Sequence, residues 1–319
     1  MRTTAAVLLA GASAALALTV PSKRTVDHQD INDTDILNFA LTLEHIENRF
    51  YLQGLQNFSQ QDFDTAGLPS GTRGFYQQIL QHEQTHVDNL TSILGGSAVQ
   101  ECTYNYPVNG NVSNFVALSD LFEEVGTAAY AGASQYIANR QALLMAASIL
   151  ATEARQSAWI NNGVRGVNPW STPYETPLDL NQAFTVASAV IVSCPSNNTQ
   201  IPVTAFPPLN VTPAMPVPGQ NMSLLFTPGN TTSNSSSSGN SSSLFAAFLQ
   251  GITPTFIPLN GTVNGSAPIN VTVPPSLQGF AFVAITNSSS EHGDNVTVAG
   301  PAFLDIPFDS NGSLTNNQH

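Results

Sequence analysis

A pattern of carboxylates occurs twice within the first half of this chain. In each copy a glutamate is followed seven residues later by a tyrosine, and a second segment reads Ile-Leu-x-x-Glu-x-x-His or Ile-Leu-x-x-Glu-x-x-Gln. Four-helix bundles use a duplicated Glu plus Glu-x-x-His set to hold two metal ions between their helices. The first copy is Glu44, Tyr51, Glu83 and His86, and the second is Glu123, Tyr130, Glu153 and Gln156.

Each copy is expected to line one stripe of each helix, because residues three, four or seven apart share a helix face. The stripes are otherwise Leu, Ile and Ala, so the carboxylates face a mostly apolar interior. Four buried glutamates cannot stay ionised together without cations, and iron or manganese suits a carboxylate-rich site with few imidazoles. The predicted ligands are Glu44, Glu83, His86, Glu123 and Glu153, and the residues that orient them are Tyr51, Tyr130, Gln156 and Glu47.

Two interpretations of this set stay open. Gln156 is a neutral, weak ligand where the first copy has His86, and Gly126 stands where the first copy has Glu47. We expect the bundle to be a scaffold with at most a residual metal site; the alternative is a two-metal oxidase or peroxide-handling enzyme. In a scaffold without metal, the polar side chains would pair with one another, with nearby arginines or with water.

The N-terminus has the features of a secretory signal. Met1-Arg2 precedes an apolar run that contains Ala15-Leu16-Ala17, which predicts cleavage near Ala17 (signal peptide 1–17). Lys23-Arg24 predicts a short propeptide, residues 18–24. No other segment approaches the roughly 20 apolar residues of a membrane span. We therefore expect a secreted protein, located outside the cell or in the cell wall.

The charge balance excludes nucleic acid as a partner. The net charge is −13 and no Lys or Arg follows Arg165, whereas phosphate binding needs clustered cations. Only 9% of residues are charged, so solubility is expected to come from glycans on sixteen Asn-x-Ser/Thr sites, twelve of them at or after Asn197. They include Asn57, Asn111, Asn210, Asn230, Asn264, Asn270, Asn295 and Asn311.

The two cysteines, Cys102 and Cys194, are expected to form a disulfide in an oxidising compartment. The closed loop would exceed 90 residues, which the chain-entropy model values at roughly 4 kcal/mol. The bond would link the connection between the two halves of the bundle to the end of the last helix.

Composition divides the mature chain into two predicted domains, a helical bundle over residues 30–195 and a β-rich, glycosylated domain over 200–319. Asp33 or Thr34 is placed to cap the first helix. Pro, Thr, Val, Ser and Asn dominate the second domain, where short strands predict a small β-sandwich. Helices are expected at 34–56, 70–94, 113–138, 140–161 and 178–192; strands at 223–227, 254–258, 269–273, 279–286, 295–299 and 302–306; and a Ser/Asn-rich loop at 227–243.

The motifs resemble the ferritin-like domain of a secreted family best represented in fungi, described as stress-response and late sexual development proteins and related to plant desiccation-related proteins. The resemblance implies an α+β protein, with a ferritin-like four-helix bundle plus a fifth helix, then a small β-sandwich-like domain. It implies a role in stress response or sexual development and the five metal ligands given above. Gln156 departs from the family pattern. The matching stretches are Asn38–Glu44, Phe50-Tyr51, His82–His86, Cys102–Tyr104, Thr152–Arg155, Ser193–Pro195 and Gly300–Phe303.

Composition alone suggests that the β-rich domain binds cell-wall polysaccharide or associates with itself. Neither partner has a sequence motif of its own. Substrate, metal identity and oligomeric state have no signature in the chain either.

Overall fold

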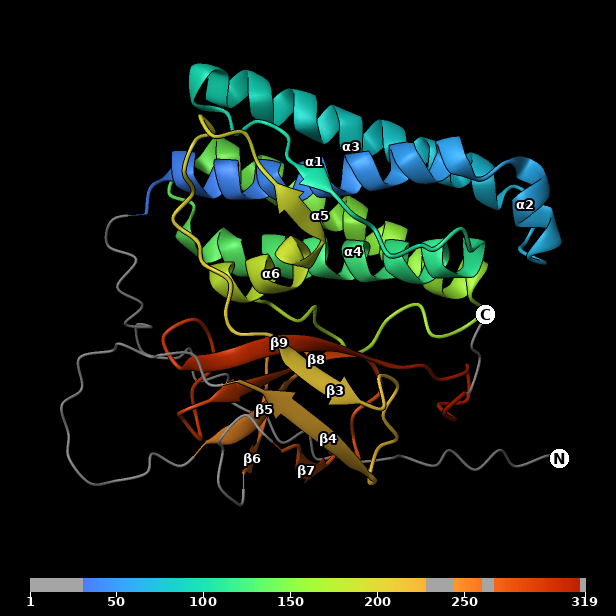
Figure 1. Ribbon diagram of the computed structural model, residues 1–319, viewed down its shortest axis with the longest axis vertical. Helices are drawn as coiled ribbons and strands as arrows, with labels where there is room; N and C mark the ends of the chain where they lie inside the picture. The colour runs from blue at the N-terminus through green and yellow to red at the C-terminus, as the bar shows by residue number, and fades with distance from the viewer. Residues whose placement is uncertain (1–30, 228–243, 260–266, 316–319) are drawn as a thin grey trace, which may run out of the picture. The chain divides into compact units, whose positions relative to one another are not determined.

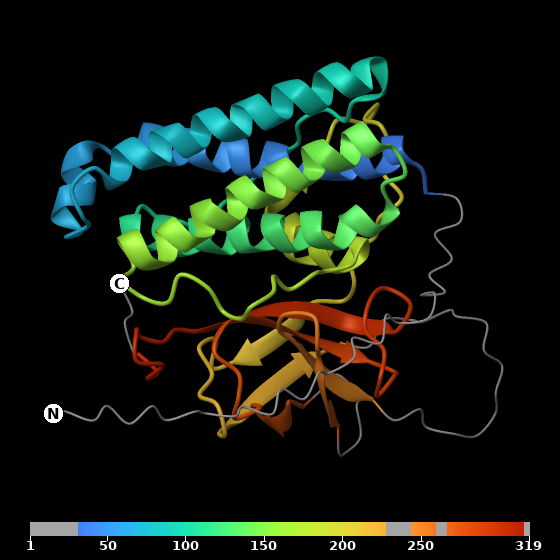
Figure 2. The ribbon, with the colours of Figure 1, turned by 180° about the vertical axis from the view of Figure 1, so that it is seen from behind.

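Four long helices form a bundle from the first half of the chain in the computed structural model, which describes residues 31–227, 244–259 and 267–315. They are α1 (Asp33–Asn57), α3 (Thr72–Leu94), α4 (Val112–Ala133) and α5 (Arg140–Trp159). Helix α1 packs along α3, and α4 packs along α5 (Figure 1, Figure 2). The four predicted helices are confirmed, although α4 ends at Ala133, where a 3-10 turn (Ser134–Tyr136) follows.

The residue that caps α1 is Asn32, so the prediction of Asp33 or Thr34 is wrong. The Asn32 side chain accepts hydrogen bonds from the backbone N–H groups of Thr34 and Asp35, at 2.8 and 3.2 Å. Asp33 instead accepts from the backbone of Ala138 and Asn139 at 2.8 and 2.7 Å. Its carboxylate therefore ties the start of the first bundle half to the helix junction in the second.

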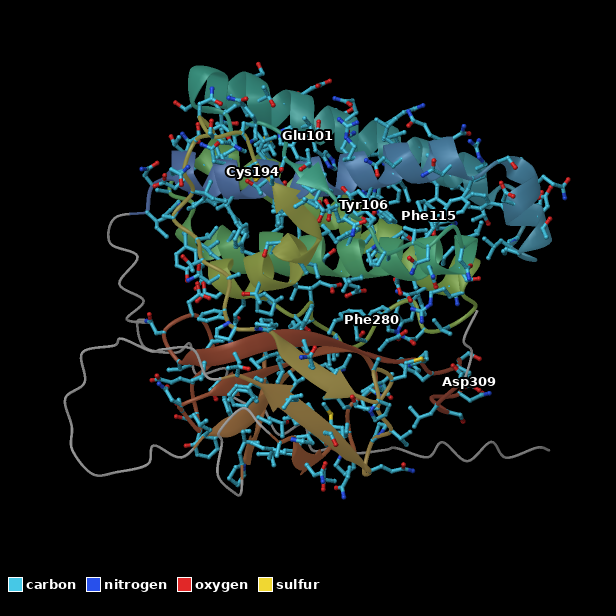
Figure 3. All side chains as sticks on the ribbon, in the orientation of Figure 1. Glu101, Tyr106, Phe115, Cys194, Phe280 and Asp309 are labelled. Carbon is cyan, nitrogen blue, oxygen red and sulfur yellow. A yellow bond between two sulfur atoms is a disulfide. The ribbon has the colours of Figure 1, made fainter. Side chains whose placement is uncertain are left out.

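A short helix, α2 (Gln60–Thr65), was not predicted. Ser59 and Asp62 form a capping box at its start, and six residues are too few to show a helical period. Its buried Phe63 lies edge-on to Phe115 of α4, with ring centroids 6.1 Å apart. Phe115, labelled in Figure 3, also stacks on Phe50 of α1 at 4.8 Å. Helix α2 therefore closes an aromatic end of the bundle.

The last predicted helix, 178–192, is shorter in the structure. Helix α6 covers Leu180–Ala187, and after a 3-10 turn (Ser188–Val190) the chain forms strand β2 (Ile191–Ser193), which pairs antiparallel with β1 (Thr103–Tyr104). The predicted disulfide between Cys102 and Cys194 is present beside this pair. It links the connection between α3 and α4 to the segment after α6, as expected. Two further turns are the 3-10 turn Gly95–Ser97 and the π turn Ile160–Val164.

The C-terminal region forms two antiparallel sheets that share one apolar core. Of the predicted strands, four are confirmed within two residues, while 295–299 and 302–306 are one continuous strand. Pro301 fits inside it because that strand is at the edge of its sheet, where a missing N–H is tolerated. The sheets are β3 (Leu209–Thr212), β4 (Asn221–Phe226) and β7 (Ile269–Thr272), and β6 (Thr255–Pro258), β5 (Phe245–Leu249), β8 (Gly279–Thr286) and β9 (Thr297–Ile306).

The four-stranded sheet is buried on both faces. Ala281, Val283 and Ile285 of β8 pack in the core shared by the two sheets, whereas Phe282 packs in the core of the helical region. All eight residues of β8 are buried as a result. A strand covered on both sides is apolar without alternation. The five-residue β5 (Phe-Ala-Ala-Phe-Leu) therefore showed no strand period and was not predicted, whereas the longer β8 was.

Several predicted features lie outside the described residues: the signal peptide, the propeptide, all but Thr227 of the Ser/Asn-rich loop, and the glycan sites Asn230 and Asn264. Within the described ranges no helix combines the length and the apolar composition needed to cross a membrane.

Gly132→Ala is expected to destabilise the protein by roughly 2 kcal/mol, because the segment before α6 crosses α4 at Gly132. A Cβ there would lie 1.7 Å from the carbonyl oxygen of Leu178, whose N–H donates to Ala128 at 3.0 Å. Gly74→Ala, in α3 and with no atom within 4 Å of its added Cβ, is the control and should stabilise the helix slightly. Urea unfolding of both variants tests this, and equal stabilities would contradict it.

Candidate metal centre

All four long helices contribute a carboxylate to one buried cluster. Residues three apart on a helix lie on one face, so α1 presents two glutamates, α3 presents Glu-x-x-His, and α5 presents Glu-x-x-Gln. Ligand atoms of Glu44, Glu83, His86 and Glu153 lie within 4.8 Å of one another. The cluster glutamates are at most 4% exposed: Glu44, Glu47, Glu83, Glu123 and Glu153.

The two tyrosines exchange partners between the halves of the bundle. Tyr51, from the first half, donates a hydrogen bond to Glu123 of the second. Tyr130, from the second half, donates to Glu44 of the first. Both tyrosines are buried, and burial with the nearby carboxylates raises their pKa values, so both stay protonated donors. The reciprocal bonds follow the sequence duplication and orient one glutamate in each half.

His86 lies between two carboxylates. Its Nδ1 is 3.1 Å from Glu44 Oε2 and 3.0 Å from Glu83 Oε2. Burial would lower the pKa of His86, but hydrogen bonds and the charges of the two glutamates outweigh burial and raise it to about 10. In the metal-free protein the protonated imidazole therefore supplies a positive charge where the donor atoms converge.

Gln156 takes part in the cluster as a hydrogen-bonding amide. Its Nε2 donates to Glu83 Oε1 at 3.0 Å and lies 3.2 Å from His82 Nδ1, while its Oε1 is buried with no partner within the described ranges. His82 is exposed but touches the site through this amide. Its position four residues before His86 was the sequence signal for such a contact.

Several carboxylate oxygens of the cluster lack hydrogen-bond donors among the described residues. Both oxygens of Glu153 and Oε2 of Glu123 are buried with no hydrogen-bond partner among the described residues. Burial, followed by mutual repulsion, raises the pKa values of Glu47 and Glu153 well above 4.5. Burial likewise raises the pKa of Glu123 well above 4.5 and that of Glu44 to about 7. Unsatisfied buried oxygens in such numbers are unfavourable unless a cation binds them.

The donor set fits iron or manganese. Carboxylate oxygens with one imidazole and no thiolate suit these ions better than copper or a structural zinc. One position is surrounded by ligand atoms of Glu44, Glu83, His86 and Glu153. Glu123 lies outside this group and accepts a hydrogen bond from Tyr51. The structure thus brings together four of the five predicted ligands as one group and places the fifth beside a predicted orienting residue.

Comparison with known proteins agrees with this architecture. Residues 32–165 match the family model described as ferritin-like domain. The chain is also similar to Protein rds1 of Schizosaccharomyces pombe, with 27% identity over 179 residues, which is 56% of this chain and 44% of that protein. The similarity thus covers less than half of that relative. The predicted fold class is confirmed: a helical ferritin-like domain is followed by antiparallel β-sheets.

Proposed function

We propose that the helical bundle binds two iron or manganese ions and uses them to handle dioxygen or peroxide. The observation that carries this proposal is Glu153, which is fully buried among four other buried glutamates. Both its carboxylate oxygens lack a hydrogen-bond partner in the part of the chain that the structure describes. A polar scaffold would pair these oxygens with arginine or amide donors. The arginines of the described residues that form close ion pairs, Arg49 and Arg165, instead bind Glu101 and two aspartates outside the cluster.

The chain's residues have distinct roles in this proposal. Bound ions would supply the electrons and the open positions that reduce dioxygen or peroxide. Glu83 and Glu153, one from each half, would help to hold the ions. The two tyrosines orient Glu123 and Glu44 through hydrogen bonds. His86 must release its proton to bind a metal. A surface pocket of about 280 Å³ between α3 and α5 includes Gln156 in its lining, so small molecules can reach a residue of the cluster.

Metal content tests the proposal. Metal-free protein incubated with Fe²⁺ or Mn²⁺ and then dialysed is expected to retain about two ions per chain, measured by elemental mass spectrometry. Glu83→Ala/His86→Ala should retain none, whereas Glu101→Ala, outside the cluster, should retain both. Saturating metal should stabilise the wild type by about 4 kcal/mol per site.

Peroxide or dioxygen consumption by the loaded protein tests the reaction. A wild-type protein that binds no ion, and whose unfolding is unchanged by metal, would contradict the proposal. If the protein binds metal but consumes neither peroxide nor dioxygen, the proposal is limited to metal binding.

The second candidate is the scaffold, in which the bundle retains at most one ion. The neutral Gln156 favours it, because its amide already hydrogen-bonds Glu83 where the first half has an imidazole. In a scaffold, Glu83→Ala should leave biological function intact while changing stability.

We also propose that the protein is a secreted glycoprotein, outside the cell or in the wall. All eleven Asn-x-Ser/Thr asparagines within the described ranges are exposed, whereas the buried Asn38, Asn161 and Asn168 belong to no such site. The disulfide suits the same compartment. Glycosidase treatment of protein from its natural host should lower its mass in steps of one glycan, and an unchanged mass would contradict glycosylation.

A role in stress response or sexual development rests on the motif resemblance. A deletion strain should show that phenotype, and complementation with Glu83→Ala separates the metal-dependent role from the scaffold. Binding of the β-rich region to wall polysaccharide rests on composition. It would be dropped if the whole protein failed to co-sediment with any wall fraction.

A further inference from the structure

We propose that Glu47 is a direct metal ligand, which takes at the second metal position the place of the imidazole that Gln156 lacks. This inference rests on the proposed two-metal function and concerns how the second ion is held. It changes the expected role of Glu47, which sequence reasoning placed behind the ligands.

The duplication shows two departures from symmetry, and they compensate each other. Glu44 corresponds to Glu123, and the crossed bonds from Tyr51 and Tyr130 to these glutamates confirm the correspondence in space. Three residues after Glu44 the first half has Glu47, where the second half has Gly126. One half has therefore gained a carboxylate, while the other has an amide in place of an imidazole.

The missing side chain at residue 126 makes room for the additional carboxylate. A Cβ at Gly126 would lie 2.8 Å from Glu47 Oε1 and 2.6 Å from Glu153 Oε2. Both oxygens thus occupy the space beside the backbone of α4 that any other residue would fill. Glu47 reaches from α1 across the bundle to α5, one turn along α4 from Glu123.

The correspondence of the two halves assigns the position of the Glu47 carboxylate to the second metal. Glu44 and His86 define the first position, together with Glu83 and Glu153, whose ligand atoms lie within 4.8 Å of theirs. By the correspondence of the halves, Glu123 and Gln156 define the second. The Glu47 carboxylate lies beside Glu153 and Gly126, both from the half that contains Gln156.

Glu47 has no other evident partner. It is 4% exposed, and within the described parts of the chain no hydrogen bond or ion pair ends on its carboxylate. Both oxygens of its neighbour Glu153 are buried and also have no hydrogen-bond partner among the described residues. Two adjacent buried carboxylates that lack donors are unfavourable in a metal-free scaffold, whereas a cation between them satisfies both. With Glu47 the second ion has a carboxylate in place of the imidazole, a substitution that suits hard ions such as Mn²⁺ and Fe³⁺.

The test compares Glu47→Gln with wild type by elemental mass spectrometry and by calorimetric titration of Mn²⁺ into metal-free protein. Wild type should bind two ions. Glu47→Gln should bind one ion with normal affinity, and its affinity for the second should fall by more than about 100-fold, the upper limit for loss of a residue that only orients a ligand. Glu47→Gln/Gln156→His should bind two again, because the second imidazole is restored. Glu124→Gln, which removes a carboxylate that bonds Ser157 outside the cluster, is the matched control and should bind two.

A structural role for Glu47 predicts a different pattern. If the Glu47 carboxylate were needed for folding, the metal-free Glu47→Gln variant would melt at a lower temperature than wild type. If Glu47 is a metal ligand, the neutral glutamine should leave the melting temperature of the metal-free protein unchanged or raise it. Three results would overturn the assignment. Glu47→Gln could bind two ions with unchanged affinity, it could lose both ions, or adding Gln156→His could fail to restore the second ion. A wild type that binds no metal would instead overturn the proposed function itself.

Discussion

Lowering the pH from 8 to 5 is expected to raise the free energy of unfolding of the metal-free protein by at least about 3 kcal/mol. Burial raises the pKa of Glu44 from 4.5 to about 7. A carboxyl group with a raised pKa favours the folded state below its unfolded value, and this stabilisation is lost as the pH rises through the folded value. A shift of one pKa unit corresponds to about 1.4 kcal/mol, so Glu44 alone accounts for roughly 3 kcal/mol of the change in unfolding free energy.

The other members of the cluster act in the same direction. The pKa values of Glu47, Glu123 and Glu153 are also raised by burial. The pKa of His86 is raised from 6.5 to about 10 by Glu44 and Glu83, against the effect of burial. Its contribution is complete below pH 6.5 and is lost as the pH rises towards 10. The folded protein therefore holds more protons than the unfolded chain throughout this range.

Urea unfolding at several pH values in the presence of a chelator measures this effect. Glu44→Gln should show a flatter profile, whereas Glu291→Gln, at an exposed position, should keep the wild-type profile because solvent screens it. Excess Fe²⁺ or Mn²⁺ should reverse the trend, since metal binding requires deprotonated ligands. Stability that is flat or rises with pH in the metal-free protein would contradict the description of the cluster.

Arg165→Met is expected to destabilise the protein by roughly 3–5 kcal/mol, the cost of leaving a buried charge without its partner. Arg165, 11% exposed, pairs with Asp120 of α4 and with Asp305 of β9. It also donates to Asn161 at 2.9 Å and lies over the ring of Phe280, labelled in Figure 3, with 5.7 Å to the centroid. One side chain therefore joins the helical region to the four-stranded sheet.

Two controls separate this effect from a general loss of charge. Arg49→Met breaks a pair with Glu101 in which the side chains are 37% and 32% exposed, and it should lower stability by less than about 1 kcal/mol. Arg165→Met/Asp120→Asn/Asp305→Asn removes the uncompensated charges and should recover much of the loss. Thermal and urea unfolding of the set gives the values. Equal losses for Arg165→Met and Arg49→Met would contradict the prediction.

Local pattern was sufficient for the helices and for most of the candidate site. Spacings of three and seven residues place Glu44, Tyr51, Glu83 and His86 on inward faces, because the helical period alone decides which residues share a face. The same argument found the second copy and the β-sandwich strands with alternating burial. It failed where a segment was too short to show a period, as in α2 and in the five-residue apolar strand β5; the longer β8, also covered on both faces, was predicted.

The sequence by itself determined the inventory of the site: which side chains are present, which helix carries each of them, and that Gln156 and Gly126 break the duplication. Only the tertiary structure decided how they are used. The crossed tyrosine bonds, the contact between His82 and Gln156, and the approach of Glu47 to Glu153 over Gly126 all join different helices. Such contacts depend on the relative position of packed helices, which the core and the connections set and which no local spacing encodes.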